Sequence, residues 1–443
     1  MTAPARRPSI VLLAYYFPPL GGIGSQRALS FARHLPAFGF DVTVVSPTRG
    51  AYGLDASLDA AAVRVVRTGS FEPAVLARKL RPSKTSAASA AGDMVEGAGE
   101  GGVRSLVRKA LQATVYFPDH ARGWVGPAAR AAARAARETN AVAIVSTSPP
   151  VSAHVAALRA AKKLGLPAVL DFRDLWTAHR DGADLSRRAE RERELERELL
   201  RDAAAVTTVS DVCRNWLASR GGGDAGRFFV LRNGFEEEDF AGPAPQREAG
   251  VFRIVHAGTA YGARQDTTAF FRALAKVRAE GAFGTRRVEC VFAGKVDGHT
   301  TAAAHAAGCG DLFLAAGFVP HTEAVRLMRT ATVNLLMTWS VPGPQGDGAC
   351  PGKMYEQMAA GRPVLALALR RSEARTLLAA TGGALVADPL DESEIAGALR
   401  RFAAADAEAD AAAAAPPRAA EVTRFSRRSV ARELASLLAS VTR

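Results

Sequence analysis

Residues 9–47, SIVLLAYYFPPLGGIGSQRALSFARHLPAFGFDVTVVSP, contain the pattern that decides the fold. An apolar run at 9–16 leads into a turn with several glycines, and a helical pattern over 25–38 is followed by a second apolar run at 41–47. Apolar runs that alternate with helical segments are typical of βαβ units, in which helices cover a parallel sheet. The sequence therefore predicts an α/β protein.

The same alternation continues along the 443-residue chain, which is long enough for two domains of about 200 residues each. An acidic stretch with prolines at 236–246 separates two series of apolar runs and predicts a linker. We predict two doubly wound, Rossmann-like domains over 1–235 and 236–415. A tail over 416–443 is expected to form an amphipathic helix at 429–441 that packs back on the first domain. Further strands are predicted at 141–147, 167–172, 204–210 and 228–233, and then at 252–258, 288–294, 312–318, 332–338 and 363–369.

Composition excludes several classes of protein. No apolar run reaches the about 18 residues of a membrane span, and the first run ends in a strand-to-helix turn, FPPLGG, instead of a signal-peptide cleavage site. We therefore expect a cytoplasmic protein. The 4 cysteines have neither CxxC spacing nor paired histidines, so neither a metal site nor a disulfide framework is expected.

The formal net charge of +13 predicts an anionic partner. The arginines are scattered and no nucleic-acid-binding module accompanies them, so nucleic acid is not expected as that partner. Phosphorylated small molecules and a membrane surface stay open at this point.

Three segments stand out by composition. Residues 81–102 are rich in Ser, Ala and Gly and predict a mobile loop. Residues 103–115 form an amphipathic pattern with arginine and lysine beside the apolar face, which fits either a helix on anionic lipid or a helix packed on the first domain. Residues 187–202 predict a solvated helix with Leu195 and Leu199 as its narrow packing stripe.

The turn after the first strand contains Gly21 and Gly22, at the edge of the sheet where open parallel sheets bind ligands. Glycines there let backbone amides approach a phosphate or a sugar closely, although a purely structural turn fits equally well. The turn is not GxGxxG, and no acid follows the second strand to bind a ribose. A nicotinamide cofactor is therefore not expected.

Residues 348–363, GACPGKMYEQMAAGRP, predict a helix over 353–360. A lysine in a first helical turn opposes the helix dipole, so Lys353 is best explained by an anion that it binds together with the helix N-terminus. Glu356 lies three positions later on the same face and could accept hydrogen bonds from ribose hydroxyls. The alternative is a surface helix with ordinary charges.

The order of its motifs makes the sequence resemble family four of the retaining glycosyltransferases over nearly its whole length. The resemblance implies the GT-B fold, in which two Rossmann-like domains face each other across a cleft, and it is greatest to the branch that assembles bacterial polysaccharides and glycosides. The motifs are YYFPPLGGIGSQRA at 15–28, FPDHARGW at 117–124, TSPPVSAH at 147–154, DFRDLWT at 171–177, TTVSD at 207–211, RNGFEEEDF at 232–240, HAGT at 256–259 and GKMYEQMAAGRPVL at 352–365.

The resemblance also assigns the donor site. It implies that Gly21 and Gly22 lie near the donor diphosphate, that Lys353 binds a phosphate and that Glu356 binds the ribose. Arg264 matches the second diphosphate cation. It follows the turn made by Gly258 and Thr259, which is also assigned to the donor.

Two departures from the family pattern concern catalysis. Arg173 takes the place of a histidine that many members have after the fifth strand, while Asp174 keeps the neighbouring acid. We count Arg173, Asp174 and Lys353 as catalytic candidates. The first of two family glutamates falls at Gly348, which puts the contacts to the sugar hydroxyls in doubt more than the activity.

The expected function is transfer of a hexose from a nucleoside diphosphate sugar, with UDP as the commonest nucleotide, to a hydroxyl of a small-molecule or lipid-linked sugar acceptor. Retention of configuration follows from the resemblance. Transfer without a metal ion is expected because no DxD motif lies in a plausible metal loop, and Lys353 with Arg264 could neutralise the diphosphate instead. No cofactor is expected besides the nucleotide-sugar donor. A sugar-nucleotide epimerase of the same fold and a catalytically silent nucleotide-binding partner protein are the alternatives.

Overall fold

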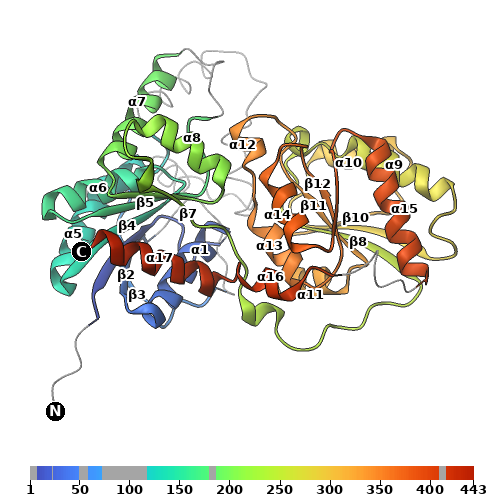
Figure 1. Cartoon of the computed structure of the whole chain (residues 1–443), viewed down its shortest axis with the longest axis horizontal. Coiled ribbons are helices and arrows are strands. Elements are labelled where there is room, and N and C mark those ends of the chain that lie inside the picture. Colours follow the sequence, from blue (N-terminus) through green and yellow to red (C-terminus); the bar gives the residue numbers. More distant parts are fainter. Residues whose placement is uncertain (1–6, 22, 49–57, 72–116, 179–185, 409–415) are drawn as a thin grey trace, which may run out of the picture. The chain divides into compact units, whose positions relative to one another are not determined.

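The computed structural model describes residues 7–21, 23–48, 58–71, 117–178, 186–408 and 416–443 (Figure 1). The loop predicted at 81–102 and the helix predicted at 103–115 lie outside these residues. The chain divides into two compact units. The first consists of Met1–Val209, Cys213–Leu231 and Ala431–Arg443, and the second of Ser210–Val212 and Arg232–Val430.

The first unit contains a seven-stranded parallel sheet in the order β3-β2-β1-β4-β5-β6-β7. The edge strand β3 is absent from the sequence prediction, because its segment RVVRT is short and has an arginine on either side of two valines. The other six strands lie where apolar runs predict them. The strands are β1 Ser9–Ala14, β2 Asp41–Pro47, β3 Arg64–Thr68, β4 Ala141–Ser148, β5 Ala168–Phe172, β6 Ala205–Thr208 and β7 Phe228–Val230.

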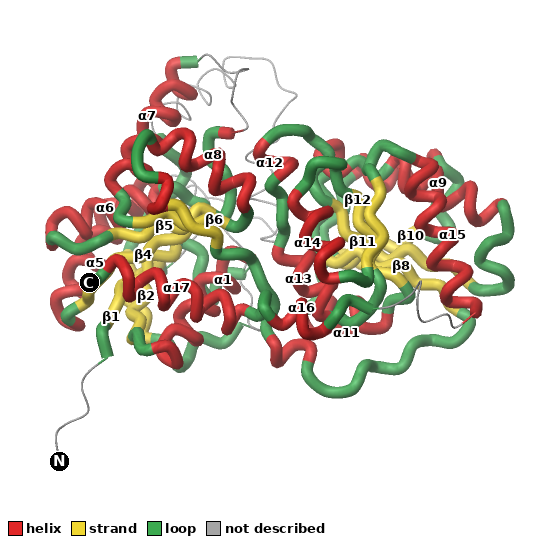
Figure 2. The backbone as a smooth tube through the Cα atoms, viewed as in Figure 1, coloured by secondary structure: helices red, strands yellow, loops and turns green. Residues whose placement is uncertain are grey.

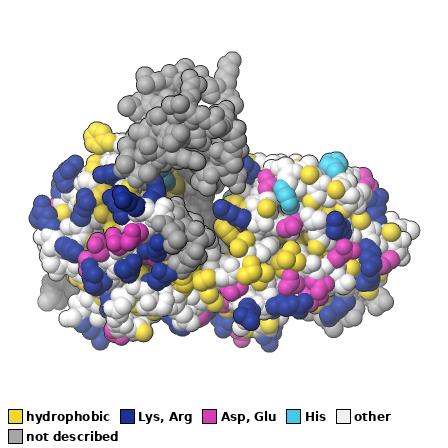
Figure 3. All heavy atoms as spheres, turned by 90° about the horizontal axis from the view of Figure 1, so that it is seen from above, with side chains coloured by type: hydrophobic (Ala, Val, Ile, Leu, Met, Phe, Trp, Pro, Cys, Tyr) yellow, Lys and Arg dark blue, Asp and Glu magenta, His cyan; other side chains and the backbone are white. Residues whose placement is uncertain are grey.

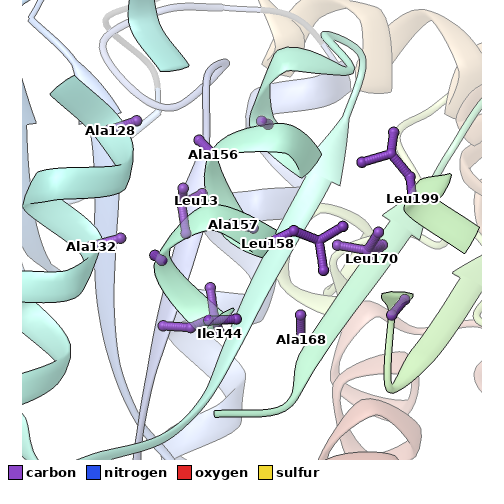
Figure 4. Packing of buried hydrophobic residues seen from close by; sticks show 14 of the residues in the cluster. Leu13, Ala128, Ala132, Ile144, Ala156, Ala157, Leu158, Ala168, Leu170 and Leu199 are labelled. Atoms are coloured by element: carbon purple, nitrogen blue, oxygen red, sulfur yellow. The ribbon is translucent and has the colours of Figure 1, made fainter. Parts of the chain in front are cut away.

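Both faces of this sheet are buried, as the alternation along β1 shows. Val11 and Leu13 belong to a core cluster that includes the alanine-rich faces of α5 and α6 (Figure 4). Ile10 and Leu12 are equally buried one residue out of phase, so they face the opposite side of the sheet. The helices are α1 Ile23–His34, α5 Val125–Thr139, α6 Ser152–Leu164, α7 Arg187–Asp202, α8 Asp211–Gly221 and α17 Arg427–Val441, of which the part from Ala431 onward belongs to this unit. The short 3₁₀ turns are η1 Leu35–Phe38, η2 Arg122–Trp124 and η4 Ala225–Arg227.

Helix α7 has a wider buried face than its leucines predict. Leu199 is buried as expected, but Glu192 and Glu196 are buried as well. Glu196 accepts hydrogen bonds from the backbone N of Thr177 at 3.3 Å and from its Oγ1 at 2.7 Å. The two glutamates are thus part of the packing, which a pattern of apolar residues does not reveal.

The second unit contains a six-stranded parallel sheet in the order β10-β9-β8-β11-β12-β13 (Figure 2). A cluster of phenylalanines, Phe252, Phe270, Phe271 and Phe292, forms much of its core. The strands are β8 Val251–Ala257, β9 Arg287–Ala293, β10 Phe313–Gly317, β11 Val333–Met337, β12 Val364–Leu367 and β13 Ala384–Ala387. The helical segments are η5 Glu237–Phe240, η6 Gly262–Gln265, α9 Thr268–Ala279, α10 Gly298–Ala306, α11 His321–Thr330, α12 Pro344–Asp347, α13 Gly352–Ala359, α14 Glu373–Thr381, α15 Glu392–Glu408 and α16 Ala419–Thr423.

The strand order of each sheet confirms two Rossmann-like domains and marks where ligands bind. In both sheets the order reverses beside the first strand, between β1 and β4 and between β8 and β11. Doubly wound sheets bind ligands at the carboxyl ends of the strands next to such a reversal. The predicted cleft between the two domains stays a prediction.

Three further findings concern the described residues: the distribution of surface charge, the absence among them of a helix that could span a membrane, and the state of the cysteines and of other metal-ligating side chains. Basic side chains are spread over the face shown in Figure 3 and are interspersed with acidic ones. Every helix in this part of the chain is too short or too polar to span a bilayer. The 4 cysteines are buried and are not joined in disulfides, and no group of His, Cys, Asp or Glu among the described residues is arranged to hold a metal ion.

Candidate functional site

In the second unit, the turn after β8 leaves room for a lysine side chain. Gly258 has a φ of +118°, which L side chains rarely adopt. A Cβ at this position would lie 3.4 Å from Cδ of Lys353 and 3.8 Å from its Nζ. Lys353 therefore runs directly over the glycine, toward the carboxyl end of β8.

Lys353 lies in the first turn of α13, as predicted, but it is buried, with only 7% of its surface exposed. Its Nζ is 3.1 Å from Nε2 of His256 and 3.5 Å from the backbone O of Thr259. Within the described part of the chain, no carboxylate forms an ion pair with it. Burial lowers the pKa of Lys353 to about 7. A buried ammonium group without a counter-ion is expected to attract an anion.

His256, the last residue but one of β8, is a site residue that the sequence analysis missed. It is fully buried, and its Nδ1 lies 3.0 Å from the backbone O of Leu335 in β11. Burial, and then the charge of Lys353, lower the pKa of His256 to about 3, so its ring is neutral. The HAGT motif contains this histidine, but nothing in the motif shows that it contacts Lys353.

Arg264 lies in η6, on the same loop, and packs on an aromatic side chain. Its guanidinium carbon is 5.3 Å from the ring centroid of Trp339, and the Trp339 ring also stacks on Tyr261 with centroids 6.2 Å apart. Gln265 fastens this loop to the end of β11 by donating a hydrogen bond to the backbone O of Met337 at 2.9 Å. Arg264 has no ion pair with any described residue, so its charge is available to a ligand.

Glu356 lies on α13 with 9% of its surface exposed, and it faces a cation that the sequence analysis missed. Its Oε1 is 3.6 Å from Nη2 of Arg427, and Nη1 of Arg427 is 3.5 Å from Oε1 of Glu236. The arginine thus lies between two carboxylates. Glu356 retains acceptor capacity beyond this one contact, because an ionised carboxylate has about four lone-pair positions.

In the first unit, the start of α1 packs tightly on Arg173. A Cβ at Gly24 would lie 2.8 Å from Nη1 of Arg173, so only glycine fits there without a shift. Ser25 Oγ donates a hydrogen bond to the backbone O of Gly21 at 3.1 Å, which fastens the turn before the helix. Gly22 lies outside the described residues.

Arg173 uses its guanidinium to hold the loop after β4. It is 8% exposed, and it donates hydrogen bonds to the backbone O of Ser148 at 2.8 Å and of Pro149 at 3.2 Å. Asp174 follows directly and is exposed. Its carboxyl group is nonetheless surrounded by protein, and this raises its pKa, against the lowering effect of the Arg173 charge. Of the two candidates, Asp174 is the side chain with solvent access.

A buried ion pair beneath these residues supports them. Asp171, at the end of β5, accepts two hydrogen bonds from Arg27 at 2.9 and 2.8 Å, and one each from Thr147 and Thr207 at 2.8 Å. Burial alone would raise the pKa of Asp171, but the charge and hydrogen bonds of Arg27, with the two threonines, hold it below its ordinary value. The pair joins α1 to β5 across 144 residues of sequence.

Of the predicted site residues, Lys353 thus contacts the turn of Gly258 and Thr259, and Arg173 contacts the start of α1. Arg264 contacts Trp339, and Glu356 lies near Arg427. The sheet edges of both units therefore carry polar or charged side chains at the places where doubly wound sheets bind ligands.

The models of two protein families match this chain. Residues 21–234 match the family described as Glycosyl transferase 4-like domain, and residues 251–405 match Glycosyl transferases group 1. No curated protein sequence matches the chain at a significant level.

Solved structures that resemble the chain over its length share little sequence with it, so they establish the fold alone. Sucrose-phosphate synthase from Thermosynechococcus elongatus has a TM-score of 0.66 at 15% identity, covering 98% of this chain and 99% of its own. A glycosyltransferase from Rickettsia africae ESF-5 has a TM-score of 0.64 at 12% identity, covering 99% of both chains. WaaG, a glycosyltransferase involved in lipopolysaccharide biosynthesis, has a TM-score of 0.61 at 13% identity, covering 97% of this chain and 99% of its own.

Proposed function

Since the chain belongs to the family-four type of glycosyltransferase and has the GT-B fold, we propose that it transfers a hexose from a nucleoside diphosphate sugar to an acceptor hydroxyl with retention of configuration. The observation that supports this proposal most is Lys353, a buried cation with no ion-paired carboxylate among the described residues. It lies in the first turn of α13, where backbone N–H groups also favour an anion. A diphosphate supplies the charge that this position lacks.

In the proposed reaction, the bond between the anomeric carbon and the diphosphate oxygen breaks, and its electron pair stays on the diphosphate. The acceptor oxygen bonds to the anomeric carbon on the same face, and its proton passes to the leaving phosphate. Lys353 and Arg264 stabilise the negative charge that develops on the diphosphate, so no metal ion is required for this role. Glu356 binds the ribose hydroxyls of the nucleotide.

The first unit is proposed to hold the reacting sugars. Asp174 has solvent access and accepts a hydrogen bond from a sugar hydroxyl, while Arg173 positions Asp174 and the loop after β4. Gly21 and Gly22 are proposed to bring backbone N–H groups close to the donor diphosphate.

UDP is the proposed nucleotide, and the acceptor is a small-molecule or lipid-linked sugar. WaaG, similar in fold, is a glycosyltransferase involved in lipopolysaccharide biosynthesis. If the amphipathic pattern at 103–115 binds anionic lipid, the protein will sediment with acidic liposomes at low salt, where electrostatic attraction is strongest. Protein that stays in the supernatant would favour a water-soluble acceptor.

The test of the proposed function starts with thermal shifts in a panel of UDP, ADP, GDP and dTDP, followed by hydrolysis of the matching nucleotide sugars. We expect one nucleotide to stabilise the protein and its sugar derivative to be turned over slowly without acceptor. Lys353→Ala should weaken nucleotide binding at least tenfold, because a charge-assisted hydrogen bond contributes about 1.5–3 kcal/mol. Lys276→Ala, which removes an exposed lysine from α9 of the same unit, is the matched control. Wild-type affinity in Lys353→Ala would refute the assignment, and nucleotide binding without any turnover would favour the silent partner protein.

A further inference from the structure

The partner of the buried lysine is a histidine held in one protonation state. A backbone carbonyl can only accept a hydrogen bond, so Nδ1 of His256, 3.0 Å from the backbone O of Leu335, carries the ring proton. The pKa of about 3 leaves the other nitrogen unprotonated. Nε2 therefore presents a lone pair to Lys353 at 3.1 Å, and the ammonium group donates to it.

The same carbonyl also fixes the helix that carries the lysine. Gln357, one turn after Lys353 on α13, donates from Nε2 to the backbone O of Leu335 at 3.1 Å. His256 and Gln357 are both fully buried, and the ring of Phe292 packs on the imidazole with centroids 5.0 Å apart. The histidine and the helix are thus joined to one atom of β11, which leaves the imidazole little freedom to move.

The neutral partner has a consequence that a carboxylate would not have. An acid beside Lys353 would cancel its charge and compete with a bound anion, whereas a neutral imidazole accepts one hydrogen bond and leaves the positive charge in place. A lysine side chain loses about 2 kcal/mol of rotamer freedom when it is fixed. A partner that fixes it before the anion arrives removes part of that loss from the binding step.

We propose that His256 is a positioning residue for the donor: it holds Lys353 against the turn of Gly258 and Thr259, with the ammonium charge uncancelled, where the diphosphate binds. This inference rests on the proposed function, because it takes a nucleoside diphosphate as the anion.

The test is a double-mutant cycle on nucleotide affinity with His256→Phe and Lys353→Met, measured by calorimetry with the nucleoside diphosphate that binds the wild type most tightly. His256→Phe keeps an aromatic ring in place but removes the acceptor. We expect it to weaken nucleotide binding about tenfold, because the lysine then loses most of its rotamer freedom, about 2 kcal/mol, on binding the anion. In the Lys353→Met background it should change the affinity less than twofold, because its effect acts through the lysine.

A merely structural role for His256 gives a different result, in which the same fold-loss occurs with and without Lys353, and that outcome overturns the inference. Unchanged affinity in the single His256→Phe variant overturns it as well. His256→Gln retains an acceptor oxygen, and we expect it to keep affinity within about threefold of wild type. If the phenylalanine variant does not fold, the cycle is run with glutamine: affinity near wild type supports the inference, and a loss that persists beside Lys353→Met overturns it.

The experiment distinguishes failure of the proposed function from failure of the inference about His256. A wild-type protein that binds none of the four nucleotides contradicts the proposed function, whereas a wild type that binds one of them, together with additive effects of the two substitutions, contradicts only the role of His256. In the full reaction, the positioning role predicts that His256→Phe raises KM for the donor more than it lowers kcat.

Discussion

Replacing Lys353 with methionine is expected to stabilise the protein while weakening nucleotide binding at least tenfold. Methionine has a similar length but no charge, so it fills the same buried space without a desolvated ammonium group. Burial lowers the pKa of Lys353 from 10.5 to about 7. The unfolded chain therefore keeps the proton of this lysine up to pH 10.5, whereas the folded protein releases it above about 7. Between these two values the free energy of unfolding rises with pH.

The size of the effect follows from the two pKa values. Their difference of about 3.5 units, at 1.36 kcal/mol per unit, makes the protonated lysine cost on the order of 5 kcal/mol of stability below pH 7. At pH 8.5 the cost falls to about 3 kcal/mol, and it vanishes above pH 10.5. The substitution also removes the hydrogen bond to His256, and this lowers the gain in the free energy of unfolding by about 1 kcal/mol. At pH 7, where the cost is about 4 kcal/mol, we expect a net gain of about 3 kcal/mol, or an increase in Tm of about 6–12 °C.

The assay is thermal unfolding of the wild type and of Lys353→Met at pH 7, 8, 9 and 10, followed by circular dichroism. The difference in Tm should be largest at pH 7 and should decline steadily toward pH 10. Lys276→Met, on the exposed face of α9, is the control and should leave Tm unchanged at every pH. The reasoning is refuted if Lys353→Met melts at a lower temperature than wild type at pH 7, or if the difference between the two is independent of pH.

Three further substitutions test other parts of the site. Glu356→Gln should leave Tm within about 2 °C, because Arg427 keeps its contact to a second carboxylate, while nucleotide affinity measured by calorimetry falls about tenfold; an unchanged affinity would show that Glu356 does not bind the ribose. Gly258→Ala should lower stability by about 1–3 kcal/mol in chemical denaturation, since alanine is strained at a φ of +118°, and a neutral effect would mean that the turn relaxes. Asp171→Asn should cost about 3–5 kcal/mol by leaving the Arg27 guanidinium buried without its counter-ion, and a cost below about 1 kcal/mol would argue that water reaches the pair.

The sequence predicted the sheets well because their central strands are fully buried. A strand covered on both faces has a continuous apolar run, and the segments that became β1, β4, β8 and β9 were all recognised in this way. The edge strands β3 and β13 lack this signal, whereas β7 and β10, which are also edge strands, were predicted from apolar runs. Three of the four residues of β13 are buried only in part, and, like β3, that strand was missed.

Only those site residues that belong to a recognisable local motif could be predicted from the sequence. Lys353 was found because a lysine in a first helical turn is unfavourable without an anion. His256 lies 97 residues away from it in sequence, and Arg427 belongs to a helix after the second sheet. Contacts of this kind depend on which strands become neighbours, and one sequence contains no signal for a single pair of residues so far apart.

The assignment of Ala431–Arg443 to the first unit has a consequence for the order in which the protein is made. Leu434 and Leu438 of α17 are almost fully buried, and Arg432 lies over the ring of Phe38. On the ribosome, these last residues follow the roughly 200 residues of Arg232–Val430, which take about 10–40 s to synthesise at 5–20 residues per second. For that time the first unit has to exist without Ala431–Arg443, and the surface that these residues cover is open to chaperones or to other nascent chains. The second unit, whose segments come out largely in one piece, is free to finish folding first.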